Sequence, residues 1–231
     1  MKFTSAVILA AGSGTRFGGA VKKQFVEVCG LTSVQRCAIA FEKCDLINEI
    51  IFVGDIDEIT RQLVSLRLKK LSSVVEGGAT RQQSALKGFD AVSNRAKYVA
   101  IHDAARCLVT PEMIGNTVKA AFKHRAALAA EKAVDTIKIV SEDGYVSKTV
   151  NRENVWLAKT PQVFLADMYR AAAYTAQKEN FEATDDCMLC ERLGFKIKPV
   201  DCGSENIKLT APEDIYRAEE ILRRRGETLY K

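Results

Sequence analysis

The sequence has no long hydrophobic run: none of its apolar stretches approaches the ~20 residues that a membrane-spanning helix requires. It also has no low-complexity segment, long linker or internal repeat. The net charge of +5 is modest and no basic stripe carries interleaved aromatic side chains, so neither a membrane nor nucleic acid is expected as a partner. What remains is a chain of 231 residues, 47% hydrophobic and 27% charged, which suits one globular domain over residues 1–231 that binds small anions.

Histidine is scarce, and the two histidines, His102 and His124, lie far in sequence from the C-x-x-C formed by Cys187 and Cys190. A structural zinc site needs a second pair of ligands at suitable spacing, so we interpret these two cysteines as small buried side chains one helical turn apart. The seven cysteines are an odd number and no secretory leader precedes the first apolar run. We therefore expect reduced thiols and a cytoplasmic protein.

Apolar runs typical of strands alternate with periodic runs typical of helices along most of the chain. The predicted strands are residues 6–10, 50–53, 74–75, 98–101, 127–130, 196–200 and 206–209. The predicted helices cover residues 34–41, 59–71, 85–92, 114–122, 165–178, 185–193 and a final segment that begins at Pro212. This alternation predicts an α/β fold, a Rossmann-like three-layer α/β/α domain with a mostly parallel, twisted sheet.

The alternation breaks near residue 134. Two β-rich runs, 136–140 and 145–150, flank Asp143-Gly144, and Asp-Gly between such runs favours a hairpin turn. We expect a β-hairpin arm, inserted over residues 136–152, that covers a site or reaches a partner.

The most informative segment is residues 6–24, AVILAAGSGTRFGGAVKKQ, in which a buried strand opens into a glycine loop. Gly12 and Gly14 expose backbone N–H groups, and Arg16 and two following lysines add positive charge, which suits a polyphosphate. The loop lacks the Gly-Lys-Ser/Thr ending of a Walker loop, and Phe17 stands where a dinucleotide fingerprint needs its third glycine. The alternative interpretation is an ordinary tight turn between a strand and a helix.

A second glycine segment, GGATRQQS at residues 77–84, lies between a predicted strand and a predicted helix. Ligands bind outside the carboxyl ends of strands in open parallel sheets, so this segment should border the site. Two glycines would let a flat nucleobase approach the backbone, and Ser84 would add a hydroxyl. Taken alone, the segment also fits an ordinary start of a helix.

Three further segments carry charged residues near the ends of predicted strands or helices. In HDAAR at residues 102–106, Asp103 is a natural position for Mg²⁺ and Arg106 could bind a phosphate through two hydrogen bonds. We interpret His102 as structural rather than as a general base. Thr184 precedes two acidic residues that would suit a helix N-terminus, and Lys208 follows near the end of a late apolar run.

Five segments follow one another in this order: AAGSGTR, GGATRQQS, HDAAR, DTIK…TVNRENVWLAKTPQ and TDD…ENIKLTAPED. Together they resemble the 2-C-methyl-D-erythritol 4-phosphate cytidylyltransferase family over about residues 5–222. The resemblance implies an enzyme that transfers the cytidylyl group of CTP to 2-C-methyl-D-erythritol 4-phosphate, with Mg²⁺, and releases pyrophosphate. The alternative is a ribitol-5-phosphate cytidylyltransferase, which shares the CTP half of the site. A non-catalytic nucleotide-binding protein on the same fold is disfavoured, because the charged residues of the family pattern are present.

The resemblance also implies roles for particular residues. Catalysis is assigned to Arg16, Lys23 and Lys208. CTP contacts are assigned to Ala10, Ala11, Gly12, Gly14, Gly78, Ser84 and Asp103, the last also as a metal ligand. Contacts with methylerythritol phosphate are assigned to Arg106, Thr136, Arg152, Thr160 and Thr184. Because the family's arm crosses a two-fold interface, Thr136 and Arg152 should serve the partner's site in a homodimer.

The sequence departs from the family pattern at three positions. Lys22 replaces the usual proline before Lys23, which leaves the rigidity of the loop open. Ala79 stands at a position that is sometimes acidic, so any contact with the base there must come from the backbone. Cys107 replaces a common proline after HDAAR, and we expect it to leave an alkylation-sensitive thiol near the substrate.

Overall fold

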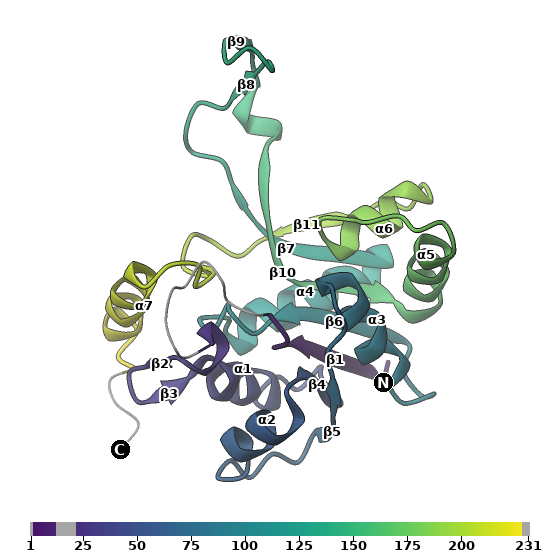
Figure 1. The fold of residues 1–231 in the computed structure, drawn as a ribbon, viewed down its shortest axis with the longest axis vertical. Helices are drawn as coiled ribbons and strands as arrows, with labels where there is room; N and C mark the ends of the chain where they lie inside the picture. Colours follow the sequence, from purple (N-terminus) through teal and green to yellow (C-terminus); the bar gives the residue numbers. More distant parts are fainter. Residues whose placement is uncertain (1, 13–21, 228–231) are drawn as a thin grey trace.

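A central sheet organises the chain in the computed structural model, which describes residues 2–12 and 22–227. Within these residues, seven strands form one sheet in the order β11-β7-β10-β6-β1-β4-β5 (Figure 1). In chain order they are β1 (Thr4–Leu9), β4 (Glu49–Gly54), β5 (Leu71–Glu76), β6 (Tyr98–Asp103), β7 (Ala126–Lys132), β10 (Trp156–Leu165) and β11 (Lys198–Asp201). Strand β10 pairs antiparallel with β6 and β7, and the other pairs in this sheet are parallel, which confirms the mostly parallel α/β fold.

Helices cover both faces of the sheet. They are α1 (Ser33–Glu42), α2 (Ile56–Leu63), α3 (Arg81–Asp90), α4 (Pro111–His124), α5 (Ala166–Lys178), α6 (Asp186–Arg192) and α7 (Glu213–Arg224). Because successive strand residues face opposite ways, Ala6 and Ile8 of β1 join one buried cluster with α1, α2, α4 and α7. Val7 and Leu9 join a second cluster with α3, α5 and α6, which confirms the predicted three layers. In the described part of the chain, no helix combines the length and the apolar character needed to cross a membrane.

The carboxyl ends of the central parallel strands lie at one edge of the sheet. Leu9 at the end of β1 is in register with Val53 of β4 and with Asp103 at the end of β6. The segments that follow these strands therefore emerge side by side. Thr80 caps the start of α3 by accepting a hydrogen bond from the backbone N–H of Gln83, at 3.1 Å, which fixes the segment after β5 at the same edge.

A hairpin stands away from this sheet (Figure 1). Its strands, β8 (Lys138–Val140) and β9 (Val146–Thr149), pair antiparallel with each other. Their side chains are exposed along their whole length, and the short 3-10 helix η3 (Arg152–Asn154) leads back to the sheet. The predicted hairpin is confirmed. A second small ribbon, β2 (Glu27–Val28) with β3 (Leu31–Thr32), was not predicted.

Three local predictions need correction. The predicted helix over 59–71 ends at Leu63, and Leu71 instead begins β5. The predicted strand over 206–209 is irregular, because Ile207 N–H bonds to Glu205 O at 2.8 Å and the backbone N–H of Leu209 bonds to Ala105 O at 2.8 Å rather than to a neighbouring strand. Strand β10 was not predicted; Pro161 lies within it, although Pro is disfavoured in a central strand.

Helix α3 approaches the sheet closely at Gly88. A β-carbon there would lie 2.3 Å from Cγ1 of Val7 and 2.5 Å from Cγ2 of Val53, both in the sheet. We expect Gly88→Ala to lower the free energy of unfolding by about 1–3 kcal/mol, the usual range for an overpacked core, in a urea titration.

Gly115 in α4 is the matched control for this substitution. A β-carbon there would meet Sγ of Cys44 at 3.9 Å, an ordinary contact. Gly115→Ala should therefore be neutral or stabilise the protein by up to about 1 kcal/mol through helix propensity. Equal effects of the two substitutions would contradict close packing at Gly88.

Candidate active site

A cavity of about 350 Å³ opens at the carboxyl edge of the sheet. Its walls come from the segments that follow β1, β5 and β6, from the start of η2 (Lys23–Phe25), and from the segment before α7. The predicted site residues that line it are Ala10, Ala11, Gly12, Lys23, Gly78, Ser84, Asp103 and Lys208. The predicted residues Gly14 and Arg16 lie outside the described residues.

Gln24 holds the start of the glycine loop against η2. Its Nε2 donates to the carbonyl oxygens of Ala10, at 2.8 Å, and Gly12, at 3.0 Å. Lys22, which replaces the usual proline, has a φ of −64°, the value that proline itself would impose. The backbone at position 22 is therefore compatible with the usual proline.

The second glycine segment forms the opposite wall. Ser84 Oγ accepts a hydrogen bond from the backbone N–H of Gly78, at 2.9 Å, and donates to the carbonyl of Thr80, at 2.9 Å. Gly77 packs directly on the first segment, since a β-carbon there would lie 2.4 Å from Cβ of Ala11. Only a glycine permits this approach, so the two walls fit closely and Ser84 shapes its own loop as well as lining the cavity.

Asp103 lies between two cations on the floor of the cavity. Its Oδ1 lies 3.0 Å from Nε of Arg81 and its Oδ2 lies 2.7 Å from Nζ of Lys208. Burial alone would raise the pKa of Asp103, but the charges of Arg81 and Lys208 outweigh it and hold this pKa well below its usual range. The carboxylate is therefore ionised throughout the physiological pH range.

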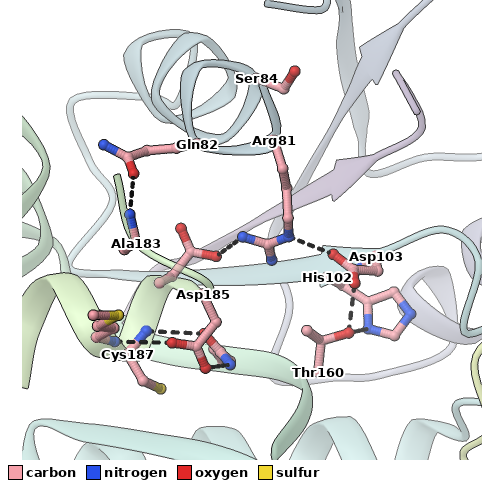
Figure 2. A network of polar contacts seen from close by, with 12 residues as sticks. Arg81, Gln82, Ser84, His102, Asp103, Thr160, Ala183, Asp185 and Cys187 are labelled. Atoms are coloured by element: carbon pink, nitrogen blue, oxygen red, sulfur yellow. Dashed lines mark hydrogen bonds and ion pairs between the residues drawn. The ribbon is translucent and has the colours of Figure 1, made fainter. Parts of the chain in front are cut away.

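His102 and Thr160 support Asp103 from behind (Figure 2). Thr160 Oγ1 accepts a hydrogen bond from the backbone N–H of Asp103, at 3.1 Å, and pairs with Nδ1 of His102, at 3.0 Å. Nε2 of His102 lies 3.2 Å from the carbonyl of Arg106, which can only accept, so this nitrogen carries the proton. Burial lowers the pKa of His102 to about 3, so the ring is neutral and fits the structural interpretation.

The residues predicted to contact methylerythritol phosphate do not line the described cavity. Arg106 donates through Nη1 to the carbonyl of Asn206, at 3.1 Å, and through Nη2 to that of Ala158, at 3.4 Å. Thr160 is buried, and Thr184 is exposed with its hydroxyl 3.6 Å from Sδ of Met188.

Thr136 and Arg152 lie on the arm. Both are exposed, and Nη1 of Arg152 donates to the carbonyl of Val134, at 2.7 Å. Neither contributes to the cavity of its own chain, as far as the described residues define that cavity.

Sequence reasoning missed a charged network behind Arg81. Nη1 of Arg81 lies 2.7 Å from Oδ2 of Asp186, a carboxylate that is 1% exposed, and Oδ1 of Asp186 accepts a hydrogen bond from the Tyr169 hydroxyl at 2.9 Å. Arg81 stands 105 positions from Asp186 in the chain. The sequence shows Arg81 within the second glycine segment, but a single sequence does not identify the residues that pair with it.

Comparison with known proteins shows the family to which this fold and these motifs belong. The family model of 2-C-methyl-D-erythritol 4-phosphate cytidylyltransferase matches residues 4–224. The chain belongs to this family. A 2-C-methyl-D-erythritol 4-phosphate cytidylyltransferase from Alkaliphilus oremlandii is 38% identical over 228 residues, which cover 97% of each chain. One from Symbiobacterium thermophilum is 40% identical over 218 residues, covering 94% of this chain and 92% of the relative.

A solved structure of the cytidylyltransferase family agrees with the fold. The crystal structure of 4-diphosphocytidyl-2C-methyl-D-erythritol synthase from Anaerococcus prevotii superposes with a TM-score of 0.87 at 32% sequence identity, covering 96% of each chain. The resemblance inferred from the five motifs is confirmed, and the chain is a nucleotidyltransferase. The ribitol-5-phosphate alternative gains no support from these relatives.

Cys107 is buried beneath the HDAAR segment, not exposed to the cavity. It is 3% exposed, and burial raises the pKa of its thiol above the ordinary value. Alkylation requires the thiolate and access to it, so the structure argues against the expected sensitivity of this cysteine.

We predict that iodoacetamide modifies Cys107 slowly in the folded protein and rapidly after unfolding, as peptide mass spectrometry would measure. Cys29 is the internal control, because its side chain is half-buried whereas that of Cys107 is fully buried. Modification of Cys107 as fast as that of Cys29 in the folded protein would contradict this placement.

Proposed function

We propose that this cavity binds CTP beside 2-C-methyl-D-erythritol 4-phosphate and joins them into 4-diphosphocytidyl-2-C-methyl-D-erythritol, releasing pyrophosphate. One observation carries the assignment of residues: Lys23 and Lys208 line the same cavity as Asp103 and two glycine segments, in a member of this family. Family membership supports the reaction, and the geometry supports the residue roles.

The chemistry requires charge neutralisation more than a base. A phosphate monoester oxygen of the acceptor attacks the α-phosphorus of CTP in line with the departing pyrophosphate. A phosphate monoester is already largely ionised near pH 7, so no side chain has to remove a proton. The neutral, buried His102 is consistent with such a mechanism. Positioning two anions against each other and stabilising the added charge are the tasks left to the protein.

The two lysines line the same cavity and fit these tasks. Lys23 stands at the start of η2 close to Gly12, and would bind the triphosphate and stabilise the pentacoordinate phosphorus and the leaving pyrophosphate. Lys208 lies beside Asp103, and would contact the α-phosphate and the incoming phosphate. Arg16 is assigned to the triphosphate by resemblance alone.

The glycine segments suit the nucleoside. Backbone groups of Ala10, Ala11 and Gly12 border the cavity on one side, and Gly78 and Ser84 border it on the other. We assign cytosine and ribose to this gap, with Gly14 added by resemblance. Ala79 lacks a polar side chain, so a base contact there would use its backbone.

The acceptor is assigned by resemblance to Arg106, Thr160 and Thr184. Of these, Arg106 has an Nε that is buried without a partner among the described residues. A buried, unsatisfied guanidinium nitrogen fits an anionic group that arrives with the substrate.

The residues present fit a magnesium ion that is held mainly by the nucleotide. Of the described residues that line the cavity, Asp103 alone carries a carboxylate, and the described chain contains no group of three His, Cys, Asp or Glu suited to a metal. Mg²⁺ is often bound by one or two carboxylates together with substrate phosphates and water. Asp103 would contact the ion, which when bound would neutralise charge on the CTP phosphates.

The arm supports a homodimer with shared sites. Ile139, Val140, Tyr145 and Val146 are 47–74% exposed on the hairpin, an apolar surface that a two-stranded ribbon cannot bury by itself. Thr136 and Arg152 flank that surface, and would complete the acceptor pocket of the partner subunit across a two-fold axis.

We also propose that residues 1–231 work as one cytidylyltransferase domain, with residues 136–152 as its arm. A cytoplasmic location is proposed because all seven cysteines, which lie in the described part of the chain, are free thiols. Disulfides persist mainly in oxidising compartments.

Release of pyrophosphate from CTP and Mg²⁺ tests the function directly, with 2-C-methyl-D-erythritol 4-phosphate and D-ribitol 5-phosphate assayed side by side. We expect release with the methylerythritol substrate alone. Release with ribitol 5-phosphate alone would move the protein to the alternative acceptor, and no release with either would contradict the assignment of the acceptor pocket.

Mixed dimers test the shared site. Lys23→Ala should lower kcat by about 10²–10³-fold, the usual cost of a lost transition-state contact, and Arg152→Ala should also be nearly inactive. If Arg152 serves the partner's site, mixed subunits should regain part of the activity, because one site in each heterodimer retains both side chains. Mixing that gives no more activity than either parent would place Arg152 in the site of its own chain.

A further inference from the structure

Asp103 receives a cation at each of its two oxygens, and one of these cations has a second task. Lys208, at 2.7 Å from Oδ2, is also assigned to the phosphates. An ammonium that turns toward a phosphate dianion shares its charge and its three donors with that group. Arg81, at 3.0 Å from Oδ1, is then the partner left to hold the carboxylate in place.

Arg81 is itself held in a fixed orientation. Its Nε points to Asp103, as Figure 2 shows. Its Nη1 lies 2.7 Å from Oδ2 of Asp186. A planar guanidinium that bridges two carboxylates cannot rotate without losing one of them. Burial alone would lower the pKa of Arg81, but Asp186 and Asp103 raise it above its usual range, so the charge persists.

Asp186 has no evident task other than this one. It is 1% exposed, and its two oxygens accept from Arg81 and from the hydroxyl of Tyr169, at 2.9 Å, which is itself fully buried. A buried carboxylate costs several kcal/mol of desolvation, and a buried ion pair is weak evidence for stability. The cost is better explained by the orientation that it imposes on Arg81.

The helix that carries Arg81 is tied to the segment before Asp186. Gln82 donates through Nε2 to the carbonyl of Phe181, at 2.9 Å, and accepts the backbone N–H of Ala183, also at 2.9 Å. These two bonds fix the start of α3 against the start of α6. The separation between the backbone that carries Arg81 and the backbone that carries Asp186 is therefore fixed by these bonds.

We propose that Arg81 is a positioning residue, oriented by Asp186 and Tyr169. It holds the Asp103 carboxylate in the position from which it contacts the nucleotide and Mg²⁺, while Lys208 binds the phosphates. The proposal rests on the proposed function, and adds to it a relay of side chains from the core to the floor of the cavity. Because Arg81 acts through Asp103, its contribution to kcat should be lost when the Asp103 carboxylate is replaced.

A double-mutant cycle on kcat measures that dependence. Arg81→Gln should lower kcat by about 10–100-fold, since small misplacements of groups in an active site have effects of this size. Asp103→Asn should lower kcat as well, and the double variant should be no slower than Asp103→Asn alone. Effects that multiply in the double variant would mean that Arg81 acts independently of Asp103, and would overturn the proposal.

Two further variants separate positioning from folding. Arg81→Lys keeps the charge but cannot bridge both carboxylates, so it should recover only part of the lost kcat. Arg81→Gln leaves the Asp186 carboxylate without its cation, and Asp186→Asn in the same chain removes that stranded charge. If this paired variant melts like the wild type and stays slow, the positioning role is supported. Recovery of full kcat would overturn it.

Controls isolate the relay from its surroundings. Arg61→Gln removes an exposed arginine that pairs with Glu58 on α2 and does not line the described cavity, and it should leave kcat unchanged. Tyr169→Phe removes one hydrogen bond to Asp186, and should lower kcat in the wild type but not further in Arg81→Gln. A wild type that releases no pyrophosphate would overturn the proposed function together with this role, whereas an active wild type and an equally fast Arg81→Gln would overturn this role alone.

Discussion

The parallel pairing of β1 with β4 and β6 is the constraint on which the rest of the structure depends. Leu9 is opposite Val53 on one side and Asp103 on the other. Backbone bonds continue the pairing past the strand ends, from Ala10 N–H to Val53 O at 2.7 Å and from Ala104 N–H to Leu9 O at 2.9 Å. A slip of one residue would exchange the buried faces of β1, so both core clusters enforce this register. The first glycine segment and Asp103 are neighbours for that reason.

The balance of charges at the cavity floor follows from this arrangement. A site for two phosphorylated substrates needs several cations, yet cations that converge without an anion repel one another. Asp103 lies between Arg81 and Lys208 and offsets part of their charge before a substrate arrives. Asp186 balances Arg81 a second time from the buried side. On the proposed assignment of Lys208, incoming phosphates would compete with this carboxylate for its ammonium group, which would link substrate binding to the arrangement of the cavity floor.

Packing and binding are separated in space. Both clusters of buried side chains lie between the sheet and its helices, and the hairpin β8–β9 contributes to neither of them. Its exposed apolar side chains therefore add no stability to the isolated chain and fit the proposed contact with a second copy. The strand-edge cavity is shaped by backbone close approach, as at Gly77 against Ala11, more than by large side chains.

Much of this protein was determined by its sequence alone. The apolar run at 6–10, the periodic helices and the Asp143-Gly144 turn are local patterns, and local patterns predict local structure. They were sufficient for the α/β class, the hairpin and the five motifs. Local patterns were also the limit: Leu71 continued a helical period although it begins β5, and no pattern was recognised over β10.

Only the tertiary structure decided which charges meet. Lys208 stands 105 positions from Asp103, and Arg81 stands 105 positions from Asp186, yet both pairs lie 2.7 Å apart. No spacing in one sequence encodes such contacts, because they depend on strand order and on how α3 and α6 are held against the sheet. The sequence thus determined which chemical groups are available to the site. The fold determined their partners, since burial and charge pairing act between segments that the chain brings together only after it folds.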